Sequence, residues 1–126
     1  MALAPESPRL MADSHIFLQK LIVKTETKRL PWRPSVESDG FTVSLDQEFV
    51  VTIRKTAPHE FFFEVRDQRD NQLFHLSAEK THAWEQGYEE AVELYASLSR
   101  LHDAARFVAL DVSKQLSRAE ALLDKL

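Results

Sequence analysis

Between Phe41 and Leu126 the spacing of hydrophobic positions changes once, in the interval from Leu76 to Tyr88. From Phe41 to Leu76, apolar residues mostly alternate with polar ones, which is typical of strands that bury one face. From Tyr88 onward, apolar residues return every three or four positions, as on one side of a helix. The pattern predicts an α+β fold in which helices pack on one face of a small sheet.

Four segments of the alternating region are expected to form the sheet. The connections between them are short enough for antiparallel neighbours and too short for parallel crossovers. We therefore expect a four-stranded antiparallel meander over about residues 41–78. The expected core combines its inward-facing side chains with three leucines of the following helix: Phe41, Val43, Phe49, Val51, Ile53, Phe61, Phe63, Val65, Phe74, Leu76, Leu94, Leu98 and Leu101.

Helices are expected before and after this sheet. The N-terminal helix should begin near residue 14, because Asp13 or Ser14 can accept a backbone hydrogen bond at its first turn. The long C-terminal helix should begin near residue 88, and its apolar seam keeps heptad spacing as far as Val112. The phase then changes, so we expect a break near 111–117 and a short terminal helix.

Length and composition predict one folded domain. The chain has 126 residues, of which 44% are hydrophobic, so we expect a single domain over residues 13–126 and a flexible tail over residues 1–12. It has no cysteine, which excludes disulfides, thiol catalysis and cysteine-based zinc sites. Neither a secretory signal nor a membrane span of ~20 apolar residues is recognisable, so a cytoplasmic protein is expected.

Signals for catalysis and metal binding are sparse. The five histidines lack the spacing of metal-binding motifs, although His75, Glu79 and His82 could be joined in a site. Scattered surface histidines are the favoured interpretation, and we expect no metal and no cofactor. The chain's two glycines, Gly40 and Gly87, do not form a phosphate-binding loop or a nucleophile elbow. An enzyme is therefore disfavoured, and no catalytic residue is assigned.

Basic residues gather near the N-terminus although the net charge of the chain is −4. Such a segment could contact phosphates while a tryptophan stacks on a base. Its residues are Lys20, Lys24, Lys28, Arg29, Trp32 and Arg33. A solvated or internally paired stripe is the favoured interpretation because the chain as a whole is acidic, and nucleic-acid binding is a secondary alternative.

The outward face of the predicted sheet carries more apolar residues than a solvated face needs. Val50 and Phe62 occupy positions where the alternation calls for polar side chains, so both should point away from the helices. An apolar centre with a charged rim is the anatomy of a protein contact. The candidate partner-binding residues are Val50, Phe62, Arg54, Glu64, Arg66 and His75. In an equally weighted alternative, the N-terminal tail or the segment around Trp32 covers this face of the sheet.

The order of short motifs resembles that of a loose group of small bacterial proteins. The motifs are Phe17-Leu18-x-x-Leu21-Ile22-x-x-Thr25, then Trp32, the meander, and Leu94-Tyr95 in the late helix. The similarity covers residues 14–126 and implies a bacterial cytosolic origin. It implies no activity, cofactor or functional residue.

The sequence favours a non-enzymatic protein-interaction module: an adaptor, a regulator, or an antitoxin- or immunity-like binder acting through the outer sheet face or the helix seam. The alternative is a small enzyme or ligand-binding protein with a pocket between sheet and helices. We also expect a homodimer through Ala105, Val108 and Val112, because a four-stranded sheet ~19 Å wide cannot cover a helix ~38 Å long.

Overall fold

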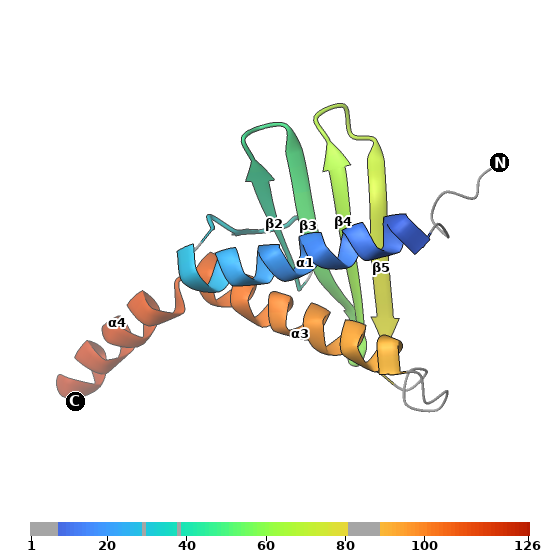
Figure 1. Cartoon of the computed structure of the whole chain (residues 1–126). Coiled ribbons are helices and arrows are strands. Elements are labelled where there is room, and N and C mark those ends of the chain that lie inside the picture. The colour runs from blue at the N-terminus through green and yellow to red at the C-terminus, as the bar shows by residue number, and fades with distance from the viewer. Residues whose placement is uncertain (1–7, 29, 38, 81–88) are drawn as a thin grey trace.

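The computed structural model describes residues 8–28, 30–37, 39–80 and 89–126. Its fold is α+β: helices α1 and α3 lie side by side over one face of an antiparallel sheet, and α4 projects from the end of α3 (Figure 1). The elements are α1 (Pro8–Lys28), β1 (Arg33–Pro34), β2 (Gly40–Leu45), β3 (Phe49–Ala57), β4 (Glu60–Asp67), β5 (Gln72–Glu79), α3 (Glu89–Ala109) and α4 (Val112–Asp124).

The predicted meander is confirmed, with one additional strand. The sheet order is β1-β2-β3-β4-β5, and each neighbouring pair is antiparallel. The additional strand β1 pairs Arg33 with Thr42 and Pro34 with Phe41. A proline lacks the N–H that an inner strand needs, and an edge strand tolerates it. The segment between α1 and β2 therefore contributes a short edge strand.

The predicted register of the sheet is confirmed at β4. Phe61, Phe63 and Val65 are buried towards the helices, whereas Phe62 is half-buried on the other face. Because side chains alternate along a strand, a shift of one residue would have exchanged these two sets.

One member of the predicted core is exposed. Phe49 is 38% exposed and pairs with Leu45 beside the turn between β2 and β3, at the end of its strand. Phe74 and Leu94 are partly buried, and the ten other predicted residues are buried. The core also contains residues from α1, the following segment, β5 and α3: Leu18, Leu21, Ile22, Trp32, Ala78 and Ala105.

Both helical regions depart slightly from their expected bounds. Helix α1 begins at Pro8, so part of the expected tail is helical, and Ser14 is buried inside the helix. Proline suits the first position of a helix because the N–H it lacks would have had no partner there. Helix α3 ends at Ala109 and α4 begins at Val112, which places the predicted break at the very start of its interval. In the described part of the chain, no helix is long and apolar enough to span a membrane.

Candidate functional site

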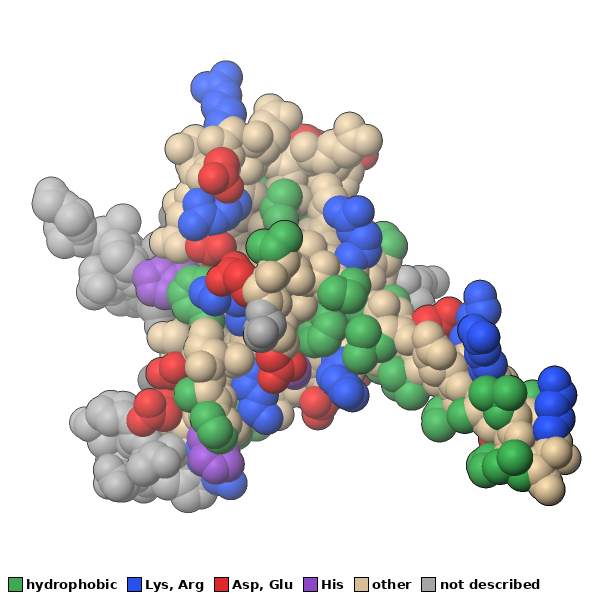
Figure 2. All heavy atoms as spheres, turned by 180° about the vertical axis from the view of Figure 1, so that it is seen from behind, with side chains coloured by type: hydrophobic (Ala, Val, Ile, Leu, Met, Phe, Trp, Pro, Cys, Tyr) green, Lys and Arg blue, Asp and Glu red, His purple; other side chains and the backbone are tan. Residues whose placement is uncertain are grey.

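The face of the sheet opposite the helices forms a broad hollow. Strands β3 and β4 supply its floor, and residues 33–37 form one wall beside the edge of β2. Its volume is about 1040 Å³. Figure 2 looks at the molecule from this side and shows charged and hydrophobic side chains interspersed over the face. None of the described helices covers this face.

Phe62 lies at the centre of this face between a cation and an imidazole. The guanidinium carbon of Arg54, its direct neighbour across the β3–β4 pair, is 5.0 Å from the centre of the Phe62 ring. The ring of His75 stacks on the same side chain, with 5.6 Å between ring centres and 24° between planes. These contacts hold the phenyl group in one orientation by cation–π and stacking interactions.

Two valines extend the apolar centre. Val50 is 38% exposed on the floor of the hollow, and Val36 on its wall is fully exposed. Both valines line the same hollow as Phe62. A single partner could therefore cover all three side chains and remove their combined apolar area from water.

Ion pairs surround this apolar centre. The Arg54 guanidinium donates to the Glu37 carboxylate at 2.6 Å, which ties the wall of the hollow to β3. Arg66 donates to Glu64 at 2.9 Å and to the backbone oxygen of Asp70 at 2.8 Å. Arg33 also lines the hollow and has no ion pair among the residues that the structure describes.

Glu64 is a buried carboxylate that side chains of its own strand and of β5 stabilise. Burial opposes its ionisation, but hydrogen bonds from Arg66 and from Gln72, at 2.9 and 2.6 Å, outweigh burial and lower the pKa of Glu64. A general acid or base working near neutral pH would need a raised pKa. This arrangement makes Glu64 a fixed anion of the rim, and it does not favour the enzyme alternative.

The six predicted partner-binding residues lie on this face. Val50, Arg54, Phe62, Glu64 and Arg66 line the hollow, and His75 adjoins it through its contact with the Phe62 ring. The alternative that the segment around Trp32 covers this face is met in part, because residues 33–37 form a wall of the hollow but leave Val50 38% exposed on its floor. The N-terminal tail before Pro8 lies outside the described residues.

The predicted basic segment is divided between different environments. Lys20 and Lys24 are exposed on α1, and Arg33 belongs to the outer-face hollow. The Lys28 side chain and Arg29 lie outside the described residues. Trp32 is buried at 3% exposure, and its Nε1–H donates to the hydroxyl of Thr25 at 3.0 Å. Its indole is thus packed in the core and is not presented for stacking on a base.

The grouping of His75, Glu79 and His82 is described only in part, since His82 lies outside the described residues. His75 and Glu79 stand four positions apart on β5, which separates their backbones by roughly 13 Å. The described ranges contain no group of three histidine, aspartate or glutamate residues that could hold a metal ion.

One of the five histidines that the sequence predicted to lie at the surface is buried. His102 of α3 is 4% exposed, and its Nε2 lies 3.1 Å from the backbone oxygen and 3.2 Å from a carboxylate oxygen of Asp39. Its ring also packs against Phe41 and Phe61. His102 directly follows the predicted core residue Leu101. An apolar stripe on α3 that was one residue wider would have included His102 and indicated its burial.

The seam expected to join two copies is mostly used within the chain. Ala105 is fully buried in the core, and Val108 and Val112 are half-buried. With 21 residues, α3 is roughly 32 Å long, shorter than the expected helix, and the sheet it meets has a fifth strand. A dimer would therefore need other surfaces than Ala105.

Comparisons of this chain with protein-family models, with curated proteins and with solved structures found no match. The resemblance to small bacterial proteins thus stays an expectation from sequence motifs.

Proposed function

We propose that this chain is a non-enzymatic protein-interaction module that binds a segment of another protein in the hollow on its outer sheet face. The placement of Phe62 supports this proposal: the ring is held between Arg54 and His75 on a face that no described helix covers. Ordered aromatic side chains beside arginines contribute most of the binding energy at many protein interfaces. Adaptors, regulators and antitoxin- or immunity-like binders all act through contacts of this kind.

The lining of the hollow indicates the chemistry of the partner. An apolar side chain inserted beside Val50 and Phe62 would also cover the exposed Val36 on the wall. Arg54 and Arg66 are paired within the chain, whereas Arg33 has no described ionic partner. A polypeptide segment that combines an apolar anchor with a nearby carboxylate fits this arrangement.

A phage-displayed library of random peptides tests the proposal without a known partner. The wild-type chain should select peptides that carry an apolar anchor and an acidic residue, and calorimetry would give their affinities. The double change Val50→Thr and Phe62→Thr keeps β-propensity while removing apolar contact area. It should weaken the selected peptides at least tenfold, and Arg33→Gln should weaken the acidic ones by a smaller factor.

Phe49→Thr is the matched control for this experiment. Phe49 adjoins Val50 in β3 and has the same exposed fraction, 38%, but the alternation of the strand directs it to the opposite face. This variant should bind the selected peptides as the wild type does. Unchanged binding by a folded Val50→Thr/Phe62→Thr variant, or failure of the wild type to select any peptide, would contradict the proposal.

A further inference from the structure

Helix α4 exposes an apolar face along its length. Every residue from Lys114 to Leu126 is exposed, and Leu116, Leu122 and Leu123 are 59%, 56% and 66% exposed. Figure 2 shows the hydrophobic side chains of this projecting helix on one side and its Lys and Arg side chains on another. A helix of 13 residues is marginal in water by itself, so α4 would gain stability from a surface that covered its apolar face.

The turn before α4 directs the helix away from its own chain. Asp111 has a left-handed backbone conformation, with φ 50° and ψ 52°. Its N–H donates to the Val108 carbonyl and its carbonyl accepts from the Gln115 N–H, both at 3.0 Å. Hydrogen bonds therefore fix the backbone on both sides of this residue, and α4 extends outward from the domain (Figure 1). A short hinge that holds an element outward favours its exchange between identical chains.

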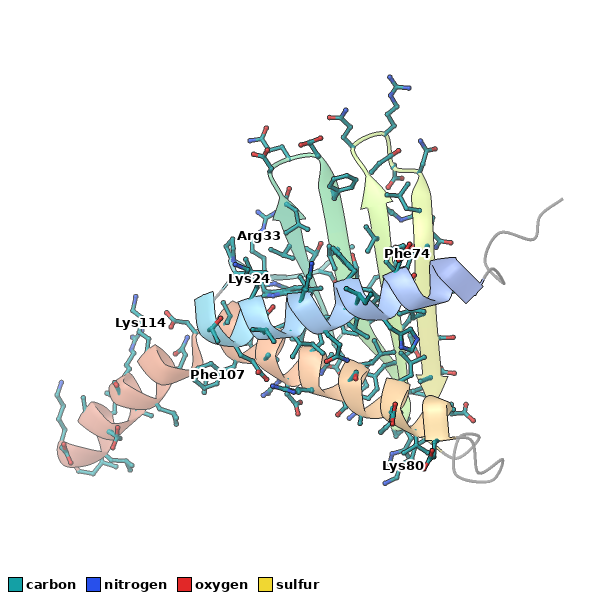
Figure 3. All side chains as sticks on the ribbon, in the orientation of Figure 1. Lys24, Arg33, Phe74, Lys80, Phe107 and Lys114 are labelled. Atoms are coloured by element: carbon teal, nitrogen blue, oxygen red, sulfur yellow. The ribbon has the colours of Figure 1, made fainter. Side chains whose placement is uncertain are left out.

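A groove along α3 has the length and polarity that α4 requires. Its volume is about 770 Å³, and it extends along α3 from Tyr95 to Val108, a rise of roughly 20 Å. The 13 residues of α4 also span roughly 20 Å. Figure 3 shows Phe107 near the junction with α4 and Lys80 near the other end of α3. The apolar lining of the groove consists of Tyr95, Ala96, Ala104, Phe107 and Val108.

The rim of this groove is polar and ordered. Arg100 of α3 donates two hydrogen bonds to the carboxylate of Glu26 of α1, which joins the two helices at the side of the groove. Asp103 and Lys80 add charges of both signs. An apolar floor between charged edges is the lining that an amphipathic helix recognises.

We propose that α4 of a second copy of this chain occupies the groove, and that two copies exchange their α4 helices reciprocally about a twofold axis. A helix roughly 20 Å long and 10 Å wide that inserts half of its cylindrical surface would bury about 300 Å² of its own surface and a similar area of the groove. Two such contacts bury about 1,200 Å², the lower end of the range for specific interfaces. Pairing of the two α4 helices alone would bury about half of that area, a size typical of crystal contacts.

This dimer uses a different surface from the proposed peptide site. The groove lies on the helix layer, whereas the hollow around Phe62 lies on the opposite face of the sheet. Of the seam residues expected from the sequence, Val108 lines the groove, and Ala105 is buried in the core. Each proposal can therefore fail while the other stands.

The first test is the mass of the chain by light scattering or sedimentation between about 1 and 200 μM. The wild type should be a dimer at the upper end of this range. Leu116→Glu with Leu123→Glu alters α4, and Ala96→Glu alters the exposed floor of the groove. Each variant should raise the dimer dissociation constant at least 30-fold. Val23→Glu changes a valine that is 52% exposed elsewhere on the helix layer and should leave the dimer intact.

Mixing the two kinds of variant tests the reciprocal geometry. A chain with altered α4 keeps an intact groove, and a chain with Ala96→Glu keeps an intact α4, so the mixture can form one complete contact. The mixture should associate more strongly than either variant alone. In an α4–α4 pair, Ala96→Glu would instead stay dimeric by itself, and that result would overturn the assignment of the groove.

Two further results would overturn the proposal of a second copy. One is a wild-type chain that stays monomeric at 200 μM, including the case in which its own α4 closes into the groove. The other is a monomer that binds vesicles of anionic phospholipid through α4, since amphipathic helices with basic residues also bind membrane surfaces. Loss of vesicle binding in the Leu116→Glu/Leu123→Glu variant would identify that outcome.

Discussion

The hydroxyl group of Thr25 joins two segments in the core. It donates to the Leu21 carbonyl at 2.8 Å and accepts from the Trp32 Nε1–H at 3.0 Å. Thr25 and Trp32 are both almost fully buried, so the indole N–H has no solvent to replace this acceptor. One side chain thereby fixes how the segment after α1 returns to the sheet.

Thr25→Val should lower the free energy of unfolding by about 1–3 kcal/mol, because it keeps the side-chain shape but leaves a buried N–H without an acceptor. Urea denaturation measures this difference. Thr27→Val is the control: the Thr27 hydroxyl makes the equivalent bond to the Val23 carbonyl at 2.7 Å but is exposed. The control should change stability by less than about 0.5 kcal/mol. Equal effects of the two changes would show that the bond to Trp32 contributes little.

At the scale of elements, the β4–β5 hairpin is stabilised by ionised carboxylates. The lowered pKa of Glu64 follows from the hydrogen bonds of Arg66 and Gln72, which outweigh burial. At the turn, hydrogen bonds from the backbone and side chain of Asn71 lower the pKa of Asp67. Both groups bind protons more weakly in the folded chain than in the unfolded chain.

The hairpin should therefore lose stability in acid. The contribution of Glu64 is complete above its ordinary pKa of 4.5 and is lost as the pH falls through the lower pKa of the folded state. Glu64→Gln should be less stable than the wild type at pH 7 and should lose less stability between pH 5 and pH 3. Urea denaturation across this range measures how the free energy of unfolding of each protein depends on pH. Parallel curves for the two proteins would contradict this role of Glu64.

Elements with a strong periodic signal were predictable, and elements without one were not. The alternation of Phe41 to Leu76 predicted four strands and their register, because a half-buried strand repeats every two residues. The two-residue strand β1 is too short for any period. The first turns of α1 precede the apolar face of the helix, so the capping signal at Ser14 placed its start too late.

At the scale of the whole molecule, Phe63 connects the two layers. Its ring lies 6.5 Å from Phe17 of α1 and 6.1 Å from Phe74 of β5, measured between centroids, and the side chain is fully buried. Phe63→Ala should lower the free energy of unfolding by about 3–5 kcal/mol through lost apolar contacts and a central cavity. Phe62→Ala, on the open face, should cost less than about 2 kcal/mol. Denaturant titrations that ranked the two variants in the opposite order would contradict this assignment of faces.

The candidate sites differ in how far the sequence could reveal them. The alternation of side chains along β3 and β4 predicted that Val50 and Phe62 share one face, because this pattern repeats every two residues and can be seen in a short stretch of sequence. The wall formed by residues 33–37 depends on the Arg54–Glu37 pair, which joins residues 17 positions apart. The α3 groove depends on how α1 and α3 pack together, and its rim pair Glu26–Arg100 joins residues 74 positions apart. Contacts between residues so far apart in the chain produce no periodic pattern in the sequence.

The side-by-side packing of α1 and α3 also determines the order of events during synthesis. Gln19 of α1 donates to Ser97 of α3, a partner 78 residues later in the chain. At about 5–20 residues per second, a ribosome needs roughly 4–16 s to add that length. The strands of the meander can pair as each one emerges, because every strand neighbours the next along the chain. Phe17 of α1 can pack on Phe63 and Phe74 once the meander has formed, but the side of α1 that meets α3 has to wait through this interval. Nascent chains would therefore present that side to chaperones until α3 has left the exit tunnel.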